Sequence, residues 1–365
     1  MTEPGTPIEA AKTLDPDQLV AGDSDELLSL ADDTPETLLE RFEERGWGDG
    51  LPLIPPTPER VLAMLGGADP SEIIATLPPR RGLATRRALA INAVLAGCRP
   101  GLLPVLTTAI RALARPEVNL RGVNATTHPV APLVIVHGDA VAELGFNAGL
   151  GTFGPGSRSN AALGRAVRLV LLHIAGARPG VGDASTQGQP SKYAYCIAEN
   201  REASPWESYP HSCGIDARSA VTVHCGENPH NFHDMEREGD PASILDKGAS
   251  VMATLGSNNA PVSSAEFFVV LGPEHATSIA GAGWSRRDVQ SYLYERARLP
   301  AGDFRRAFDV TQYRAWENAL SDSDPKPVTD HPDNIRVLVA GGAGKHSCVI
   351  PSWGMTRSVT AALED

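Results

Sequence analysis

The sequence predicts a mixed α/β fold (α+β) in which Gly-rich loops lie between buried strands and helices. Hydrophobic residues make up 42% of the 365 residues and charged residues 21%, proportions typical of a globular chain with a substantial core. Short β-branched runs alternate irregularly with longer stretches of helical periodicity. The 35 glycines and 30 prolines gather between these runs, which indicates many ordered loops.

Residues 1–33 are predicted to form a disordered acidic tail, because they hold nine Asp or Glu, one Lys and little apolar pattern. The globular region is expected to span 34–365. It opens with a helix from Thr34, which is the expected cap, to Gly46. Prolines then fix an extended path over 48–57, before a second helix starts at Thr57.

The remaining elements follow from apolar periodicity and turn residues. Further helices are expected over 85–98, 102–114, 139–144, 157–175, 242–255, 274–280, 286–296 and 312–320. Strands are expected over 132–136, 192–197, 220–223, 267–271 and 336–339, with a last one around Val349. No internal repeat is found, and the polar stretch at 180–190 suggests a division into two lobes.

Charge and cysteine content exclude several classes of protein. A net charge of −12 argues against nucleic-acid binding. No apolar run approaches the roughly 18 residues that a membrane span needs, and no secretory signal is recognised. Five sparse cysteines argue against a disulfide framework, so a reducing, cytoplasmic location is expected. The oligomeric state stays open, homo-oligomers included.

Two Gly-rich loops are candidate binding elements. Gly149–Gly154 matches G-x-G-x-x-G, but a short helix separates it from the preceding strand, which disfavours a dinucleotide site. We expect an anion pocket instead, in which Arg158 and Asn160 at the next helix start bind a carboxylate or phosphate. The second loop, Gly341–His346, departs from the P-loop pattern and reads as a strand-loop-strand turn, or as a substrate-facing loop that uses Lys345 and His346.

Histidines and carboxylates supply the candidate catalytic groups. His230 and His233 are considered as ligands of a divalent metal, although the flanking residues favour a loop and no C-x-x-C spacing supports the site. His128, in the loop before a buried strand, and His275, at a helix start, are candidate general bases. Glu199, where a strand ends, is a candidate acid, base or ligand.

Several segments together resemble a family of bacterial proteins associated with, or fused to, small selenoproteins that carry a Sec-Gly-Ser-Cys or Cys-Gly-Ser-Cys motif. These segments are 46–57, the Asn124–Pro129 loop, 153–160, Lys192–Asn200, Gly272–His275 and Gly341–Ser347. The chain lacks that motif itself, so the resemblance implies the large partner of a system that uses a reactive thiol or selenol. The resemblance also implies that His230 and Asn231 belong to the family motif.

Three functional hypotheses follow. In the first, an enzyme or enzyme subunit cleaves or reduces a carbon–heteroatom bond of a small anionic molecule, with a thiol or selenol protein as partner. In the second, a self-sufficient hydrolase or lyase uses a metal held by His230 and His233. In the third, the chain is a non-catalytic binding subunit. The expected substrate-binding residues are Asn124, Arg158, Asn160, Lys192, Asn231, Asn258, Asn259, Lys345 and His346.

Overall fold

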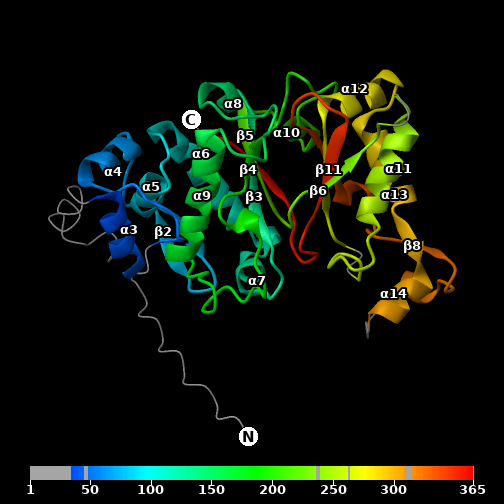
Figure 1. Cartoon of the computed structure of the whole chain (residues 1–365), viewed down its shortest axis with the longest axis horizontal. Helices are drawn as coiled ribbons and strands as arrows, with labels where there is room; N and C mark the ends of the chain where they lie inside the picture. The colour runs from blue at the N-terminus through cyan, green and yellow to red at the C-terminus, as the bar shows by residue number, and fades with distance from the viewer. Residues whose placement is uncertain (1–33, 45–47, 236–238, 262–263, 309–314, 365) are drawn as a thin grey trace, which may run out of the picture.

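A computed structural model describes residues 34–44, 48–235, 239–261, 264–308 and 315–364, and it confirms the mixed α/β class (Figure 1). The main helices are α3 (Pro35–Glu44), α4 (Pro58–Leu65), α5 (Arg86–Leu95), α6 (Leu103–Leu113), α7 (Leu120–Ala125), α8 (Ala140–Glu143), α9 (Arg158–His173), α10 (Tyr209–Ser212), α11 (Pro241–Met252), α12 (Pro273–Gly281), α13 (Arg286–Arg296), α14 (Ala301–Ala307) and α15 (Ala315–Asn318). The acidic tail lies outside the described residues, as does the predicted end of α3 at Gly46.

Among the described residues, the strands form two sheets of four strands and two short sheets of two strands. The first sheet has the order β12-β5-β3-β4 and the second the order β6-β11-β7-β10. Their bounds are β3 (Ala131–Gly138), β4 (Cys196–Ala198), β5 (Ser219–Gly226), β6 (His230–His233), β7 (Phe267–Leu271), β10 (Ile335–Val339), β11 (His346–Pro351) and β12 (Val359–Ala362). The two-stranded sheets pair β1 (Ile73–Leu77) with β2 (Gly82–Thr85), and β8 (Arg298–Pro300) with β9 (Pro325–Pro327).

The two sheets repeat one arrangement strand for strand. In each sheet an inner strand, β3 or β7, has one parallel neighbour and one antiparallel neighbour, and the antiparallel neighbour pairs with an edge strand. The chain therefore contains a structural repeat that its amino-acid sequence does not display.

The repeats exchange their edge strands. After β5 the chain leaves the first sheet, and β6 pairs with β11 of the second. After β11 it returns, and β12 pairs with β5. The crossing point is closed by a bridge between Gly226 and Ser352, with hydrogen bonds from the Glu227 and Trp353 amides to the facing strand. The segment at 180–190 connects α9 and β4, which lie in the same half.

Four layers result, with the two sheets inside and helices on both outer faces (Figure 1). Alternate residues of the strands face the other sheet or a helical layer, as the pleat of a strand requires. Leu133, Ile135, Phe268 and Val270 belong to the cluster between the sheets. Their strand neighbours join one of two larger outer clusters with the helices.

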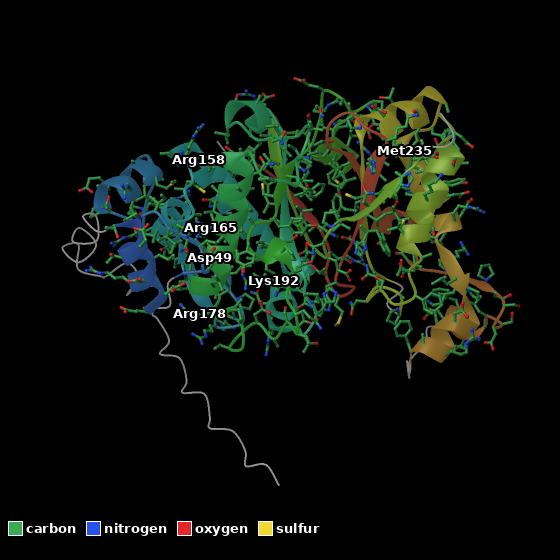
Figure 2. All side chains as sticks on the ribbon, in the orientation of Figure 1. Asp49, Arg158, Arg165, Arg178, Lys192 and Met235 are labelled. Atoms are coloured by element: carbon green, nitrogen blue, oxygen red, sulfur yellow. The ribbon has the colours of Figure 1, made fainter. Side chains whose placement is uncertain are left out.

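An ion pair holds the extended segment that follows Gly48 against α9. Arg165 donates from Nε and Nη2 to the two carboxylate oxygens of Asp49, at 2.8 and 2.7 Å, and both residues are labelled in Figure 2. The same guanidinium also donates to the carbonyls of Leu51 and Pro52. Arg165 therefore anchors the start of the proline-rich path predicted for this segment.

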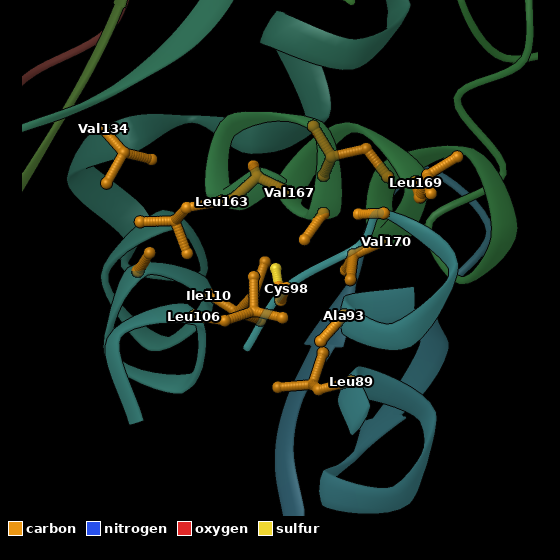
Figure 3. Packing of buried hydrophobic residues seen from close by; sticks show 14 of the residues in the cluster. Leu89, Ala93, Cys98, Leu106, Ile110, Val134, Leu163, Val167, Leu169 and Val170 are labelled. Carbon is orange, nitrogen blue, oxygen red and sulfur yellow. The ribbon is translucent and has the colours of Figure 1, made fainter. Parts of the chain in front are cut away.

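The outer core of the first half lies where α5, α6 and α9 meet (Figure 3). Leu89, Ile110, Leu163 and Val170 from these helices are fully buried together with Val134 of β3. Thr85 caps α5 as expected, since its hydroxyl accepts from the Ala88 amide. This close packing gives the first sheet a rigid support.

The expected elements agree with the structure most closely where periodicity is strong. β7 and α13 have the predicted bounds, whereas the strand expected over 192–197 is reduced to β4 after a short 3-10 turn at Pro190–Lys192. The segment around His230, expected as a loop, forms β6 because β11 supplies its hydrogen bonds. Across the described ranges, no helix combines the length and apolarity that crossing a bilayer requires.

Candidate functional site

The carboxyl ends of the parallel strands β7 and β10 form the candidate site. β7 lies between β10 and β11, so the loop that joins β10 to β11 passes over the end of β7. At that end Gly272 begins α12, with Pro273 in its first turn and no side chain capping the helix. Strand ends of this kind, followed by a helix N-terminus, are common ligand sites in α/β proteins.

His275 and Ser347 form a hydrogen-bonded pair at this edge. Nδ1 of His275 lies 2.7 Å from Oγ of Ser347, which also accepts from the amide of Gly272 at 3.0 Å. The imidazole is buried and stacks on Phe232 with ring centroids 6.1 Å apart. Its Nε2 is buried and has no hydrogen-bond partner among the described residues.

Two cavities flank the loop from Gly341 to Lys345. The larger, about 530 Å³, is lined by His275, Lys345 and Asn200 among others. The smaller, about 270 Å³, is lined by Asn231, His346 and Ser347, together with Gly151–Gly154. Gly341 lines both cavities, so the two form neighbouring compartments of one edge.

Close backbone contacts require glycine in this loop region. A Cβ on Gly272 would lie 2.3 Å from the carbonyl oxygen of His346, and one on Gly342 would lie 2.7 Å from Leu150. Gly341 also donates its amide to the carbonyl of Ala148 at 2.8 Å. The Gly-rich loop of the first half therefore packs directly on the β10–β11 loop and covers the smaller cavity.

β6 brings a second set of predicted residues to the smaller cavity. Oδ1 of Asn231 lies 3.2 Å from Nδ1 of His346, and the rings of His346 and His233 are 5.7 Å apart. Asn231 and His233 are two residues apart on a strand, so they share one face of it. His230 is three residues from His233 and therefore faces the other way.

The larger cavity favours a neutral imidazole. Burial lowers the pKa of His275, and the nearby His346 and Lys345 lower it further, while Asp234 and Glu274 act in the opposite direction. Glu274 also accepts from the amide of Gly344 at 2.9 Å, which fixes the loop against α12. A neutral ring can accept a proton at Nε2 or donate one from it, depending on the tautomer.

The expected anion pocket at the start of α9 does not form as predicted. The guanidinium of Arg158 donates from Nε to the carbonyl of Gly97 at 2.9 Å, and the residue lies over the N-terminal helices (Figure 2). Asn160 is buried and uses its amide to hold Asn147 and Thr152 of the Gly-rich loop. Arg158 is engaged by a distant segment and Asn160 by the Gly-rich loop, and neither lines the cavities beside His275.

Glu199 lies inside the first sheet rather than in a cavity. Its Oε2 lies 2.7 Å from Nδ1 of His137 and its Oε1 accepts from the Tyr209 amide at 2.8 Å. The other ring nitrogen of His137 is 2.8 Å from the hydroxyl of Thr222. The carboxylate is 1% exposed and every one of these partners is internal, so its role is structural in this arrangement.

His128 and His230 meet at the opposite edge of the sheets, where β3 starts. His128 Nε2 lies 3.0 Å from Glu227 Oε1, and His230 Nε2 lies 3.3 Å from Glu227 Oε2. The predicted histidines are therefore divided between two edges: His128 and His230 lie where β3 starts, and His275 lies at the carboxyl ends of β7 and β10. Lys192 also lies away from His275, bonded to Asp183 and Ser185.

The remaining amides support the backbone. Asn124 donates to the carbonyl of Pro78 at 2.8 Å. Asn259 is fully buried and donates to the carbonyl of Glu266 at 3.3 Å, just before β7 begins. Asn258 lies half-buried in the same turn after α11. None of the three lines a cavity at the carboxyl edge.

The proposed metal ligands do not converge. His230 and His233 lie on opposite faces of β6, and His230 is bonded to Glu227. Within the described part of the chain, no group of three or more His, Cys, Asp or Glu side chains has a metal-binding arrangement.

Sequence reasoning missed Ser347, Glu227 and His137. Each gains its role from a partner far away in the chain, such as His275 for Ser347. His137 carried a usable signal, because a histidine inside a buried β-branched run must find hydrogen-bond partners. Comparisons of the chain with protein-family models and with curated proteins found no match.

Proposed function

We propose that this protein is an enzyme that binds a small anionic organic molecule at the carboxyl edge of β7 and β10, where His275 transfers a proton. One observation carries the proposal: Nε2 of His275, in a ring held by Ser347, is buried beside a cavity of about 530 Å³ without a protein partner. An unsatisfied buried nitrogen costs roughly 1–3 kcal/mol. A bound molecule that hydrogen-bonds to it removes that cost.

The surroundings favour an anionic group near the imidazole. The uncapped first turn of α12 presents backbone N–H groups and the positive end of the helix dipole. Lys345 lines the same cavity and adds a cation, while two carboxylates on the wall are already hydrogen-bonded, Asp234 to Lys247 and Glu274 to the Gly344 amide. A carboxylate bound there would present its neighbouring carbon, or a heteroatom, to Nε2.

The reaction that follows is proton abstraction. Neutral His275 accepts the proton on Nε2, and the electron pair stays on the substrate. If a heteroatom group then leaves from the adjacent carbon and takes its bonding electrons, the pair left by the proton forms a carbon–carbon double bond. Cleavage of a carbon–heteroatom bond therefore needs only this base and an anion anchor.

A reductive version requires a thiol or selenol from another protein, because the exposed Cys213 lines neither cavity beside His275. Burial raises the pKa of Cys98, Cys225 and Cys348 to about 12, and it raises that of Cys196 as well. These four thiols are therefore poor nucleophiles at neutral pH. The small partner implied by the family resemblance would supply the reactive group, and the free cysteines fit a reducing, cytoplasmic setting.

The proposal is tested without knowing the substrate. The purified protein is incubated in D2O with the fraction of a cell extract below 1 kDa, with and without a Cys-Gly-Ser-Cys partner protein. Mass spectrometry then follows compounds that gain deuterium or disappear. His275→Gln keeps a polar side chain but cannot act as a base, and Arg158→Gln is the matched control.

We expect wild type and Arg158→Gln to change the same acidic compounds at similar rates. His275→Gln should change them at least a hundredfold more slowly. Equal changes with wild type and His275→Gln would remove His275 from the reaction. If no compound changes while one is retained in equilibrium dialysis, the chain is a binding subunit and the enzymatic proposal fails.

A further inference from the structure

A second cavity, of about 620 Å³, lies away from His275 in the first half of the molecule. It is bounded by the start of the extended segment at Gly48 and Asp49, by α9, and by the loop that leads to β4. Asp49, Arg165 and Lys192 lie close together in this region of Figure 2. Nothing in the proposed reaction uses this cavity.

Two cations on its wall share a single carboxylate oxygen. Lys192 donates from Nζ to Oδ2 of Asp183 at 2.6 Å, and Arg168 donates from Nη2 to the same oxygen at 3.1 Å. All three side chains are largely buried, with exposed fractions of 13%, 12% and 4%. Bringing two like charges together on one oxygen is unfavourable unless further negative charge is supplied.

One neighbouring carboxylate, Asp49, also acts on Arg168, but it does not remove the excess. Asp49 is already neutralised by its bidentate pair with Arg165. The cluster therefore carries one excess positive charge, because its three cations face only two carboxylates. These groups are Arg165, Arg168, Lys192, Asp49 and Asp183. Burial is the main cause that lowers the pKa of both Lys192 and Arg168, and the charge of Arg168 lowers the pKa of Lys192 further.

Hydrogen-bond donors also remain available. Both hydrogen bonds of Arg168, to Asp183 and to the carbonyl of Ala177, come from Nη2. Within the described residues Nη1 and Nε of Arg168 have no acceptor. Lys192 uses two of its three N–H groups, for Asp183 and for Ser185 Oγ. Carboxylates and phosphates are the groups that such neighbouring charged donors bind.

The rest of the wall is apolar or uncharged. Leu172, Pro179, Pro190 and Tyr193 line the cavity beside the cations. We propose that this cavity binds a small organic monocarboxylate, with the carboxylate on Arg168 and Lys192 and an apolar body against these four residues. One negative charge balances the excess of the cluster, which distinguishes this ligand class from dianions such as phosphate esters.

The probe for this site is 4-fluorobenzoate, compared with 4-fluorobenzamide, which has the same shape and no charge. Binding is followed by 19F NMR on the full chain. We expect 4-fluorobenzoate to bind and 4-fluorobenzamide to bind at least tenfold more weakly. Arg168→Gln and Lys192→Gln should each raise the Kd for 4-fluorobenzoate at least tenfold, while Arg158→Gln should leave this Kd unchanged.

Two further variants separate the alternatives. Asp183→Asn raises the excess charge and should tighten 4-fluorobenzoate binding, which keeps the test valid if a cation variant does not fold. His275→Gln should not change the Kd, whereas a loss of binding in this variant would place the probe at the other site. Equal binding of benzoate and benzamide probes, or no binding of either by wild type, would overturn the proposal.

Discussion

Nε2 of His128 and Oε1 of Glu227 lie 3.0 Å apart, which joins the loop before β3 to the residue that follows β5. The second oxygen of Glu227 receives His230 at 3.3 Å, so one carboxylate connects three segments. Burial alone would raise the pKa of Glu227, but the hydrogen bonds from His128 and His230 outweigh it and lower the pKa to about 2. The same contact raises the pKa of His230.

This carboxylate should make folding stability sensitive to acid. Its folded-state pKa, about 2, lies below the ordinary value of 4.5, so the unfolded chain binds the proton first as the pH falls. Stability that is present above pH 4.5 is therefore lost between pH 4.5 and 2, by roughly 3 kcal/mol at most, at 1.36 kcal/mol per pKa unit.

Urea unfolding of wild type and Glu227→Gln at a series of pH values measures this contribution. The variant should be less stable at pH 6 and lose less stability on acidification. Parallel curves for the two proteins would show that the contact contributes no pH dependence. The raised pKa of His230 acts in the opposite direction, because its contribution is present below pH 6.5 and is lost as the pH rises through the folded value.

Glu199→Ala should destabilise the fold by about 3 kcal/mol, because it leaves His137 and the Tyr209 amide buried without their partner. Glu202→Ala, at an exposed neighbouring position, should change stability by less than about 0.5 kcal/mol. Chemical denaturation compares the two variants. A Glu199→Ala protein with wild-type stability and no turnover would instead restore Glu199 to the catalytic groups expected from the sequence.

Gly272→Ala should destabilise the protein by about 2 kcal/mol, since its Cβ would lie 2.3 Å from the carbonyl of His346. Gly281, in the last turn of the same helix, has nothing within 4 Å of its Cβ position. Gly281→Ala should therefore be neutral or stabilising by up to about 1 kcal/mol. Thermal unfolding of the pair tests whether the tight contact at the candidate site is real, and equal midpoints would argue against it.

One thiol in five should react rapidly in the native protein, because Cys213 is exposed and the other four cysteines are buried. Titration with a chromogenic disulfide reagent at pH 8 measures the number. The count should rise to five in denaturant and fall to zero in native Cys213→Ser. Fast reaction of a second thiol would show that a buried cysteine becomes accessible, contrary to its raised pKa.

The sequence predicted the elements in which local pattern and tertiary environment agree. The five residues of β7 are all apolar and lie in the middle of a sheet, so their bounds could be read directly. β6 and β12 could not be read, because His230–His233 has one buried residue and Val359–Ala362 has none. Both are strands only because β11 and β5, distant in the chain, complete their hydrogen bonds.

The candidate site was predicted in part. His275 at a helix start and Lys345 in a Gly-rich loop do line one cavity, which fits a dipole argument made from local sequence. Arg158 was misplaced because helix-start geometry alone does not say where a long side chain points. Its guanidinium found the carbonyl of Gly97 on another segment, a contact that depends on how the helices pack.

The exchanged edge strands have a consequence for synthesis on the ribosome. β12 completes the first sheet but emerges about 130 residues after β5, when the second sheet has already been translated. Until then β5 presents an open edge to the nascent chain and to its neighbours, and such edges favour aggregation. The pairing of β12 with β5 is therefore a late step of folding, and chaperones that shield open β-edges should raise the folding yield.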